Sequence, residues 1–150
     1  MSGTRRNLCR VVLDTSALLV IGKHGNFSEI AEALEGVCDG LTFVTPKRVL
    51  DEVSRIALEK GRRGLAARLL LKLLSKGYLN PEVVEVGSCA SADECVLKLT
   101  LELKSSGERV VAVTLDRELS ERLKEFEILC ATWWHSRRKF TLSSGPKREP

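Results

Sequence analysis

Short runs of Val, Leu and Ile without regular polar alternation are the feature that most constrains the fold. A strand covered on both faces has this character, whereas a strand with one wet face alternates. These runs therefore predict buried strands of a parallel sheet. The predicted strands are Arg10–Asp14, Leu41–Thr45, Val83–Val86, Arg109–Thr114 and Ile128–Thr132.

Segments with helical period separate these runs, and most have recognisable ends. Thr45 before Pro46 predicts an N-cap, Gly61 and Gly77 predict helix ends, and Ser91 with Glu94 forms a capping box. The predicted helices cover residues 27–35, 46–60, 63–76, 91–105 and 117–125. Alternating strands and helices predict an α/β fold in three layers, with a doubly wound, central parallel sheet flanked by helices.

The length of 150 residues fits one compact domain. We expect a flexible leader over 1–9, the folded domain over 10–136 and a basic, disordered tail over 137–150, which is rich in Ser, Gly, Pro and charge. No apolar run approaches the roughly 20 residues of a membrane span. The apolar stretch after the N-terminal arginines contains Asp14 and lacks a small-residue cleavage site, so we expect a cytoplasmic protein.

Charge is concentrated at the two ends of the chain. The net charge is +4, residues 1–13 hold three arginines and no acid, and residues 137–150 hold five basic residues and one acid. The body between them is therefore acidic. Basic ends indicate a polyanionic partner, although charged termini also serve solubility alone.

The five cysteines are spaced irregularly, with no C-x-x-C pair and only two histidines to complete a zinc site. We interpret them as buried free thiols.

Two acids follow predicted strands. Asp14 ends the first strand, and Asp116 follows the strand Arg109–Thr114. Ligands of such sheets bind beyond the carboxyl ends of the strands, where strand order reverses. Each acid would also serve as an ordinary helix N-cap, so the pair carries more information than either member.

Helical geometry selects two further acids from two adjacent pairs. In the Pro46 helix, Glu52 lies roughly 100° from the centre of the apolar face, whereas Asp51 lies roughly 160° away, in solvent. In the Ser91 helix, Asp93 lies about 90° from the centre and Glu94 about 170°. Side chains at the border of the apolar face can reach over a sheet edge toward a shared cleft. A solvated, salt-bridging helix surface is the alternative for each acid taken alone.

Convergence of Asp14, Glu52, Asp93 and Asp116 would demand a cation or protons. Two like charges about 4 Å apart repel by roughly 4 kcal/mol at an effective dielectric near 20. Ligation by oxygen alone suits Mg²⁺ or Mn²⁺ better than zinc. Such ions activate water and stabilise charge on phosphoryl oxygens.

Four motifs resemble those of PIN-domain nucleases, in order, spacing and identity, over about residues 10–132. They are Val11-Val12-Leu13-Asp14-Thr15-Ser16-Ala17-Leu18-Leu19, Val49-Leu50-Asp51-Glu52-Val53, Ser91-Ala92-Asp93-Glu94 and Val111-Ala112-Val113-Thr114-Leu115-Asp116-Arg117-Glu118-Leu119. The resemblance implies a single-strand-specific endoribonuclease that uses Mg²⁺ or Mn²⁺. It carries the four acids over as catalytic metal ligands, with Ser16 and Thr114 orienting water or carboxylate.

The resemblance leaves the biological role open. PIN domains act in ribosomal RNA processing, in RNA decay and as VapC-like toxins, and the segment Asp116–Leu123 resembles the ribosomal branch more closely. The resemblance also implies a homodimer and, for a toxin, a protein inhibitor. An RNA-binding assembly factor that keeps the fold without cleaving is the non-enzymatic alternative.

Basic residues near the C-terminus are candidate RNA contacts. Arg137, Arg138 and Lys139 follow the last predicted strand, and we expect them to contact phosphates. The preceding Trp133 and Trp134 either stack on bases or, as we favour, pack in the core and at an oligomer contact.

Other phosphate-handling folds fit less well. The position two residues after Asp14 is Ser16, so the second Asp of haloacid-dehalogenase-like phosphatases is missing. Leu18 stands where an integrin-like Asp-x-Ser-x-Ser motif has its last Ser. The sequence also lacks a Walker-type Gly-Lys-Ser/Thr loop.

Overall fold

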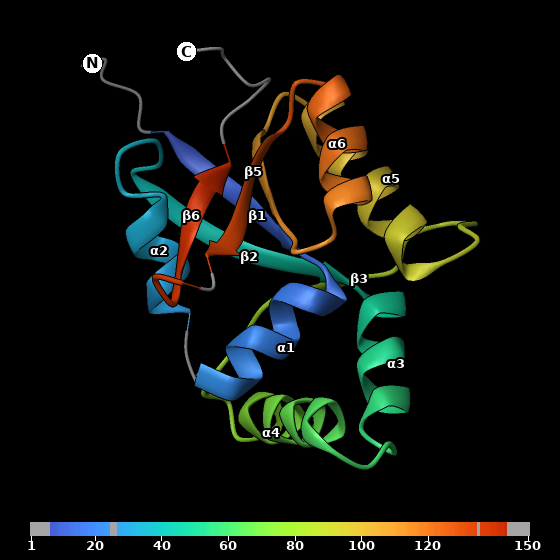
Figure 1. Cartoon of the computed structure of the whole chain (residues 1–150). Coiled ribbons are helices and arrows are strands. Elements are labelled where there is room, and N and C mark those ends of the chain that lie inside the picture. Colours follow the sequence, from blue (N-terminus) through green and yellow to red (C-terminus); the bar gives the residue numbers. More distant parts are fainter. Residues whose placement is uncertain (1–6, 25–26, 135, 144–150) are drawn as a thin grey trace.

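The computed structural model describes residues 7–24, 27–134 and 136–143, and these form a mixed α/β fold around a six-stranded sheet (Figure 1). The strands are β1 (Leu8–Leu13), β2 (Gly40–Pro46), β3 (Glu82–Val84), β4 (Arg109–Val113), β5 (Leu129–Trp134) and β6 (Lys139–Ser143). The helices are α1 (Thr15–His24), α2 (Ser28–Ala33), α3 (Lys47–Ile56), α4 (Arg62–Ser75), α5 (Ala92–Ser105) and α6 (Arg117–Glu125).

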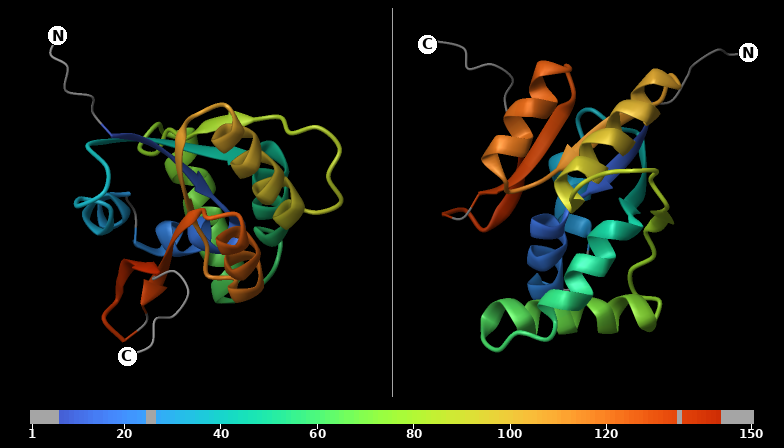
Figure 2. Two further views of the ribbon diagram at one scale, coloured as in Figure 1. Left: turned by 90° about the horizontal axis from the view of Figure 1, so that it is seen from above. Right: turned by 90° about the vertical axis from the view of Figure 1, so that its right-hand side faces the viewer.

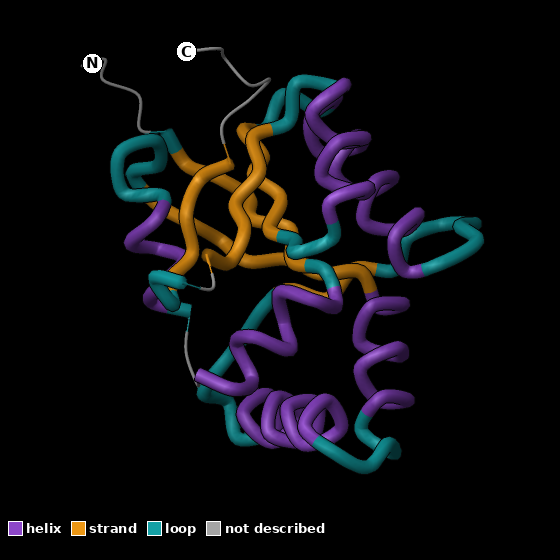
Figure 3. The backbone as a smooth tube through the Cα atoms, in the orientation of Figure 1, coloured by secondary structure: helices purple, strands orange, loops and turns teal. Residues whose placement is uncertain are grey.

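The sheet has the order β3-β2-β1-β4-β5-β6 (Figure 3). All neighbouring strands are parallel except β5 and β6, which form an antiparallel pair. Strand order reverses between β1 and β4, because β2 and β3 lie on one side of β1 and the later strands lie on the other. This reversal point is where doubly wound sheets bind ligands.

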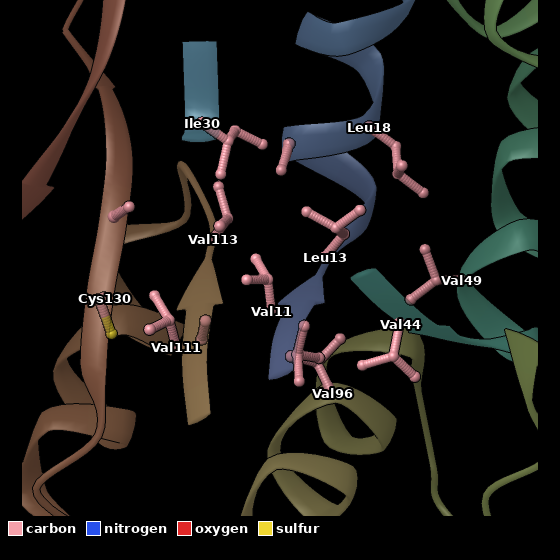
Figure 4. Packing of buried hydrophobic residues seen from close by; sticks show 14 of the residues in the cluster. Val11, Leu13, Leu18, Ile30, Val44, Val49, Val96, Val111, Val113 and Cys130 are labelled. Atoms are coloured by element: carbon pink, nitrogen blue, oxygen red, sulfur yellow. The ribbon is translucent and has the colours of Figure 1, made fainter. Parts of the chain in front are cut away.

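Helices cover both faces of the sheet centre. Val11, Val12 and Leu13 are consecutive residues of β1, so their side chains point to alternate faces, and all three are fully buried. Figure 4 shows side chains of α1, α2, α3 and α5, among them Leu18, Ile30, Val49 and Val96, gathered around the central strands. The predicted α/β class and the central sheet flanked by helices are confirmed.

The ends of several elements differ from the predicted ones. The second predicted helix ends at Ile56, and Gly61, with φ of +91°, precedes α4 instead of closing α3. Pro46 replaces Thr45 as N-cap residue, because the Thr45 hydroxyl donates to the Leu13 carbonyl 2.8 Å away. None of the helices in the described ranges has the length and apolar character of a membrane span.

The sheet extends beyond the expected domain at both ends. Leu8 and Cys9 of the expected leader belong to β1, and β6 occupies part of the expected tail. Residues 1–6 and 144–150, which complete the leader and the tail, lie outside the described residues.

The interpretation of the cysteines as free thiols is wrong for four of the five. Disulfides join Cys9 to Cys38 and Cys89 to Cys95, and Cys130 remains a buried free thiol. The first pair arises from the fold, because Leu8 is in register with Gly40 and the two chain segments enter β1 and β2 side by side.

Candidate active site

Asp14 lies at the carboxyl end of β1 with its side chain 2% exposed. Its Oδ1 accepts hydrogen bonds from Ser16 Oγ at 2.8 Å and from the Ala17 amide at 2.9 Å. Its Oδ2 accepts a short hydrogen bond from Thr114 Oγ1. Asp14 therefore binds one of the N–H groups in the first turn of α1, so the residue can serve both as a cap and in the site.

Two hydroxyl groups tie Asp14 to the turn that follows β4. Ser16 Oγ accepts from the Leu115 amide at 2.9 Å, and Thr114 Oγ1 accepts from the Asp116 amide at 2.9 Å. Each hydroxyl donates a hydrogen bond to Asp14 and accepts one from a backbone N–H. The carboxylate is thus held in one orientation, as expected of groups that support a ligand.

Glu52 reaches the site from α3. Its Oε1 accepts a hydrogen bond from Thr15 Oγ1 at 2.6 Å. The adjacent Asp51 points elsewhere and forms an exposed ion pair with Lys47 at 3.3 Å. The helical period thus separated these neighbours correctly.

Asp93 lies in the first turn of α5, after the N-cap residue Ser91, whose Oγ accepts from the Glu94 amide at 3.2 Å. Burial raises the pKa of Asp93, and the negative charges of Asp116 and Glu52 raise it further. A hydrogen bond with Asp116 also favours the protonated form and raises that pKa. Asp93 therefore interacts electrostatically with each of the other candidate acids.

Asp116 is the N-cap residue of α6, where its Oδ1 accepts from the Leu119 amide at 3.1 Å. Asp116 thus caps α6 and also interacts with Asp93. The alternative interpretation as a helix N-cap is therefore correct, and it does not exclude a role in the site. Glu94, the neighbour of Asp93, instead pairs with Arg122 at 3.1 Å on the surface.

The donors fit a hard divalent cation. All four are carboxylates, and Glu52 and Asp116 disfavour the charged form of Asp93, so a cation would relieve that repulsion. No three His, Cys, Asp or Glu side chains within residues 7–24, 27–134 and 136–143 lie close enough for a preformed metal cluster.

Two residues that interact with the site acids were not predicted from the sequence. Thr15 binds Glu52, and Glu118 adds a negative charge that raises the pKa of Asp93. Thr15 directly follows Asp14, and Glu118 stands in the first turn after Asp116, so adjacency to strand-end acids was the available signal. Their partners come from other elements, which the sequence does not place.

The basic residues near the C-terminus lie on the hairpin formed by β5 and β6. Arg137 and Arg138 lie in the connection, Lys139 begins β6, and all three are exposed. Trp133 is 8% exposed and packs in the core, as we favoured, whereas Trp134 is 43% exposed.

Known proteins share this architecture. The structure of the PIN domain endonuclease Utp24 is similar with a TM-score of 0.65 and 15% identity, covering 89% of this chain and 90% of that one. A domain of a functionally unknown protein from Methanocaldococcus jannaschii is similar with a TM-score of 0.53 and 16% identity, covering 94% and 96%. Identities this low show the fold alone, and no curated protein matches the sequence.

The sequence itself matches the family model described as PIN-like domain over residues 11–132. This range contains all four carboxylates and both hydroxyl groups that bind Asp14. The match covers most of the chain. The chain therefore belongs to the PIN-like domain family of nucleases.

Proposed function

We propose that the protein is an endoribonuclease that cleaves single-stranded RNA with Mg²⁺ or Mn²⁺. The observation that carries this proposal is the electrostatic interaction among acids from four chain segments near the reversal point of the sheet. Asp93 is the centre of this group, because Asp116, Glu52 and Asp14 all interact with it electrostatically.

The protein's own groups prepare the reaction. Asp14, Glu52, Asp93 and Asp116 would hold the cation, which when bound supplies charge stabilisation at the scissile phosphate and activation of water. Ser16 and Thr114 orient the Asp14 carboxylate, and the Thr15 hydroxyl fixes Oε1 of Glu52. The Asp93 carboxyl group holds a proton more readily than a free aspartate, because its pKa is raised by burial and by the charges of Asp116 and Glu52.

Matched neighbouring acids provide the test. Asp14→Asn, Glu52→Gln and Asp93→Asn should each reduce Mn²⁺-dependent cleavage of a labelled single-stranded RNA by at least about 100-fold. Asp51→Asn and Glu94→Gln should retain activity, because those side chains bind Lys47 and Arg122 on the surface. Full activity in Asp14→Asn, or equal losses in the control variants, would refute the proposal.

Arg137, Arg138 and Lys139 are proposed to bind substrate phosphates. The position of these residues supports the proposal. They follow β5, which runs parallel to β4 and therefore ends at the same sheet edge as the carboxylates. Removal of residues 137–150 would also remove β6, so substitution is the better test. Arg138→Gln with Lys139→Gln should lower the salt dependence of RNA binding, and an unchanged slope would contradict these contacts.

Ribosomal RNA processing is the proposed role, supported by the resemblance of the segment Asp116–Leu123 to that branch. The test compares cleavage of a precursor ribosomal RNA fragment with an unrelated RNA of equal length. Cleavage at defined sites in the precursor alone supports the role. Indiscriminate cleavage, with growth arrest on expression that Asp14→Asn relieves, would favour the toxin alternative.

A further inference from the structure

The two tryptophans of β5 face opposite sides of the β5–β6 hairpin. Trp133 is in register with Phe140 and packs against it, with ring centroids 5.1 Å apart, and also against His24 at 4.8 Å. Successive side chains of a strand alternate in direction, so Trp134 must face the other way. Its indole is 43% exposed, which leaves a large aromatic surface open to solvent.

Arg137 covers part of this exposed ring. Its guanidinium carbon lies 4.9 Å from the centroid of the Trp134 ring. The backbone fixes the pair, because the amides of Arg137 and Arg138 both donate to the Trp134 carbonyl, at 3.1 and 2.7 Å. Arg138 adopts a left-handed φ of +55°, which turns the chain back toward β6. The hairpin thus presents a flat indole beside a flat guanidinium.

The charge around this pair is positive and uncompensated. Arg137, Arg138 and Lys139 form no ion pair within the part of the chain that the structure describes. Arg138 and Lys139 are exposed beside the ring. An aromatic surface with adjacent unpaired cations matches the two chemical features of single-stranded nucleic acid, π-faces and phosphates.

The hairpin leaves the sheet at the edge that carries the acids. The Thr114 amide donates to the Ala131 carbonyl at 3.1 Å, which places Ala131 beside the site. β5 continues from there to Trp134, about 10 Å further along the strand at roughly 3.3 Å per residue. Figure 2 shows the hairpin beside α1, whose last residue, His24, packs on Trp133.

We propose that Trp134 and Arg137 form a stacking platform for one unpaired base of the RNA substrate, with Arg138 and Lys139 on the flanking phosphates. This inference rests on the proposed function. A stacked base must be free on one face, which duplex RNA does not offer, so the platform selects single strands. The flat guanidinium and indole favour a base over an acidic peptide, whose carboxylates need charge alone.

Tryptophan fluorescence reports on the platform directly. The chain has two tryptophans, so Trp133→Phe leaves Trp134 as the sole tryptophan, which excitation at the red edge of the absorption band selects over Tyr78. Titration with a 12-nucleotide oligoadenylate in EDTA, which prevents metal-dependent cleavage, should quench Trp134. A 12-base-pair RNA duplex and polyglutamate of equal charge should quench it far less. Equal quenching by polyglutamate, or none by oligoadenylate, would overturn the proposal.

Affinity and salt dependence separate stacking from phosphate contact. Trp134→Ala should weaken oligoadenylate binding about tenfold with an unchanged salt slope, and Trp134→Phe should restore most of the loss. Arg138→Gln with Lys139→Gln should lower the slope by about 1.4 instead. Wild-type affinity in Trp134→Ala, with unchanged far-ultraviolet circular dichroism, would also overturn the proposal. Binding is measured without cleavage, so inactive carboxylates and a missing platform give different results.

Discussion

Asp14 carries its charge where water hardly reaches it. Burial raises its pKa to about 6, although hydrogen bonds from Thr114, Ala17 and Ser16 each favour the charged form. An acid whose folded pKa exceeds its unfolded value stabilises the fold fully below the unfolded pKa. That stabilisation is lost as the pH rises through the folded pKa. The relevant window therefore runs from about pH 4 to about pH 6.

Asp14→Asn should stabilise the metal-free protein at neutral pH. The raised pKa corresponds to a cost of roughly 3 kcal/mol for ionised Asp14 at pH 7, from which the poorer hydrogen bond to Thr114 subtracts. We expect urea unfolding in EDTA to give the variant an advantage of about 1–3 kcal/mol at pH 7 that vanishes below pH 4. An advantage independent of pH would contradict the assigned pKa. Added Mn²⁺ should stabilise only the wild type.

Thr15→Val should weaken divalent cation binding about tenfold, because the isosteric side chain no longer donates to Glu52. Thr15→Ser keeps the hydroxyl and should bind within about twofold of the wild type. Calorimetric titration with Mn²⁺ measures both, and thermal unfolding in EDTA monitors the fold. Wild-type affinity in Thr15→Val would show that this hydrogen bond does not position Glu52.

The sequence predicts the direction of a site side chain where the period of a single helix determines it. The period of a single helix separates Glu52 from Asp51, and this pair diverges as predicted. Asp93 interacts with Asp116 and Glu94 pairs with Arg122, but Asp93 is the more exposed of the two, so their predicted order of burial is wrong. The role of Thr15 was not predicted, because its hydrogen bond to Glu52 depends on how α1 packs against α3, and no local sequence pattern encodes that packing.

Caps made the later helices predictable. Ser91 opens α5 and Asp116 opens α6 at the expected residues. No bounds were predicted for α1, although Asp14 was recognised as a possible N-cap, because the apolar run from Ala17 to Ile21 has no polar residue to reveal a helical period. β6 was missed because Lys139–Ser143 is a strand only through its pairing with β5.

The two disulfides should differ in their contribution to stability. Cys9 and Cys38 are 29 residues apart, whereas Cys89 and Cys95 are 6 apart. A longer closed loop restricts the unfolded chain more, so loop closure predicts losses of roughly 3.6 and 2.2 kcal/mol. Urea unfolding of the two double Cys→Ser variants should show this order. The reverse order would indicate that folded-state contacts outweigh loop entropy.

The sheet edge at β6 belongs to the cooperative fold of the whole molecule. Phe140 is 4% exposed and packs on Trp133, whereas Phe126 is 47% exposed. We expect Phe140→Ala to lower the free energy of unfolding by about 3 kcal/mol or more and Phe126→Ala by well under half of that. Chemical denaturation of both variants is the measurement, and equal losses would mean that β6 frays independently of the core.

The acids that meet at the reversal point are spread along the chain from residue 14 to residue 116. During synthesis, the ribosome therefore adds about 100 residues after Asp14 before Asp116 exists. A truncated or nicked product can keep individual helices and still lack the assembled centre. Under the proposed function, cleavage therefore reports that the tertiary structure has been completed.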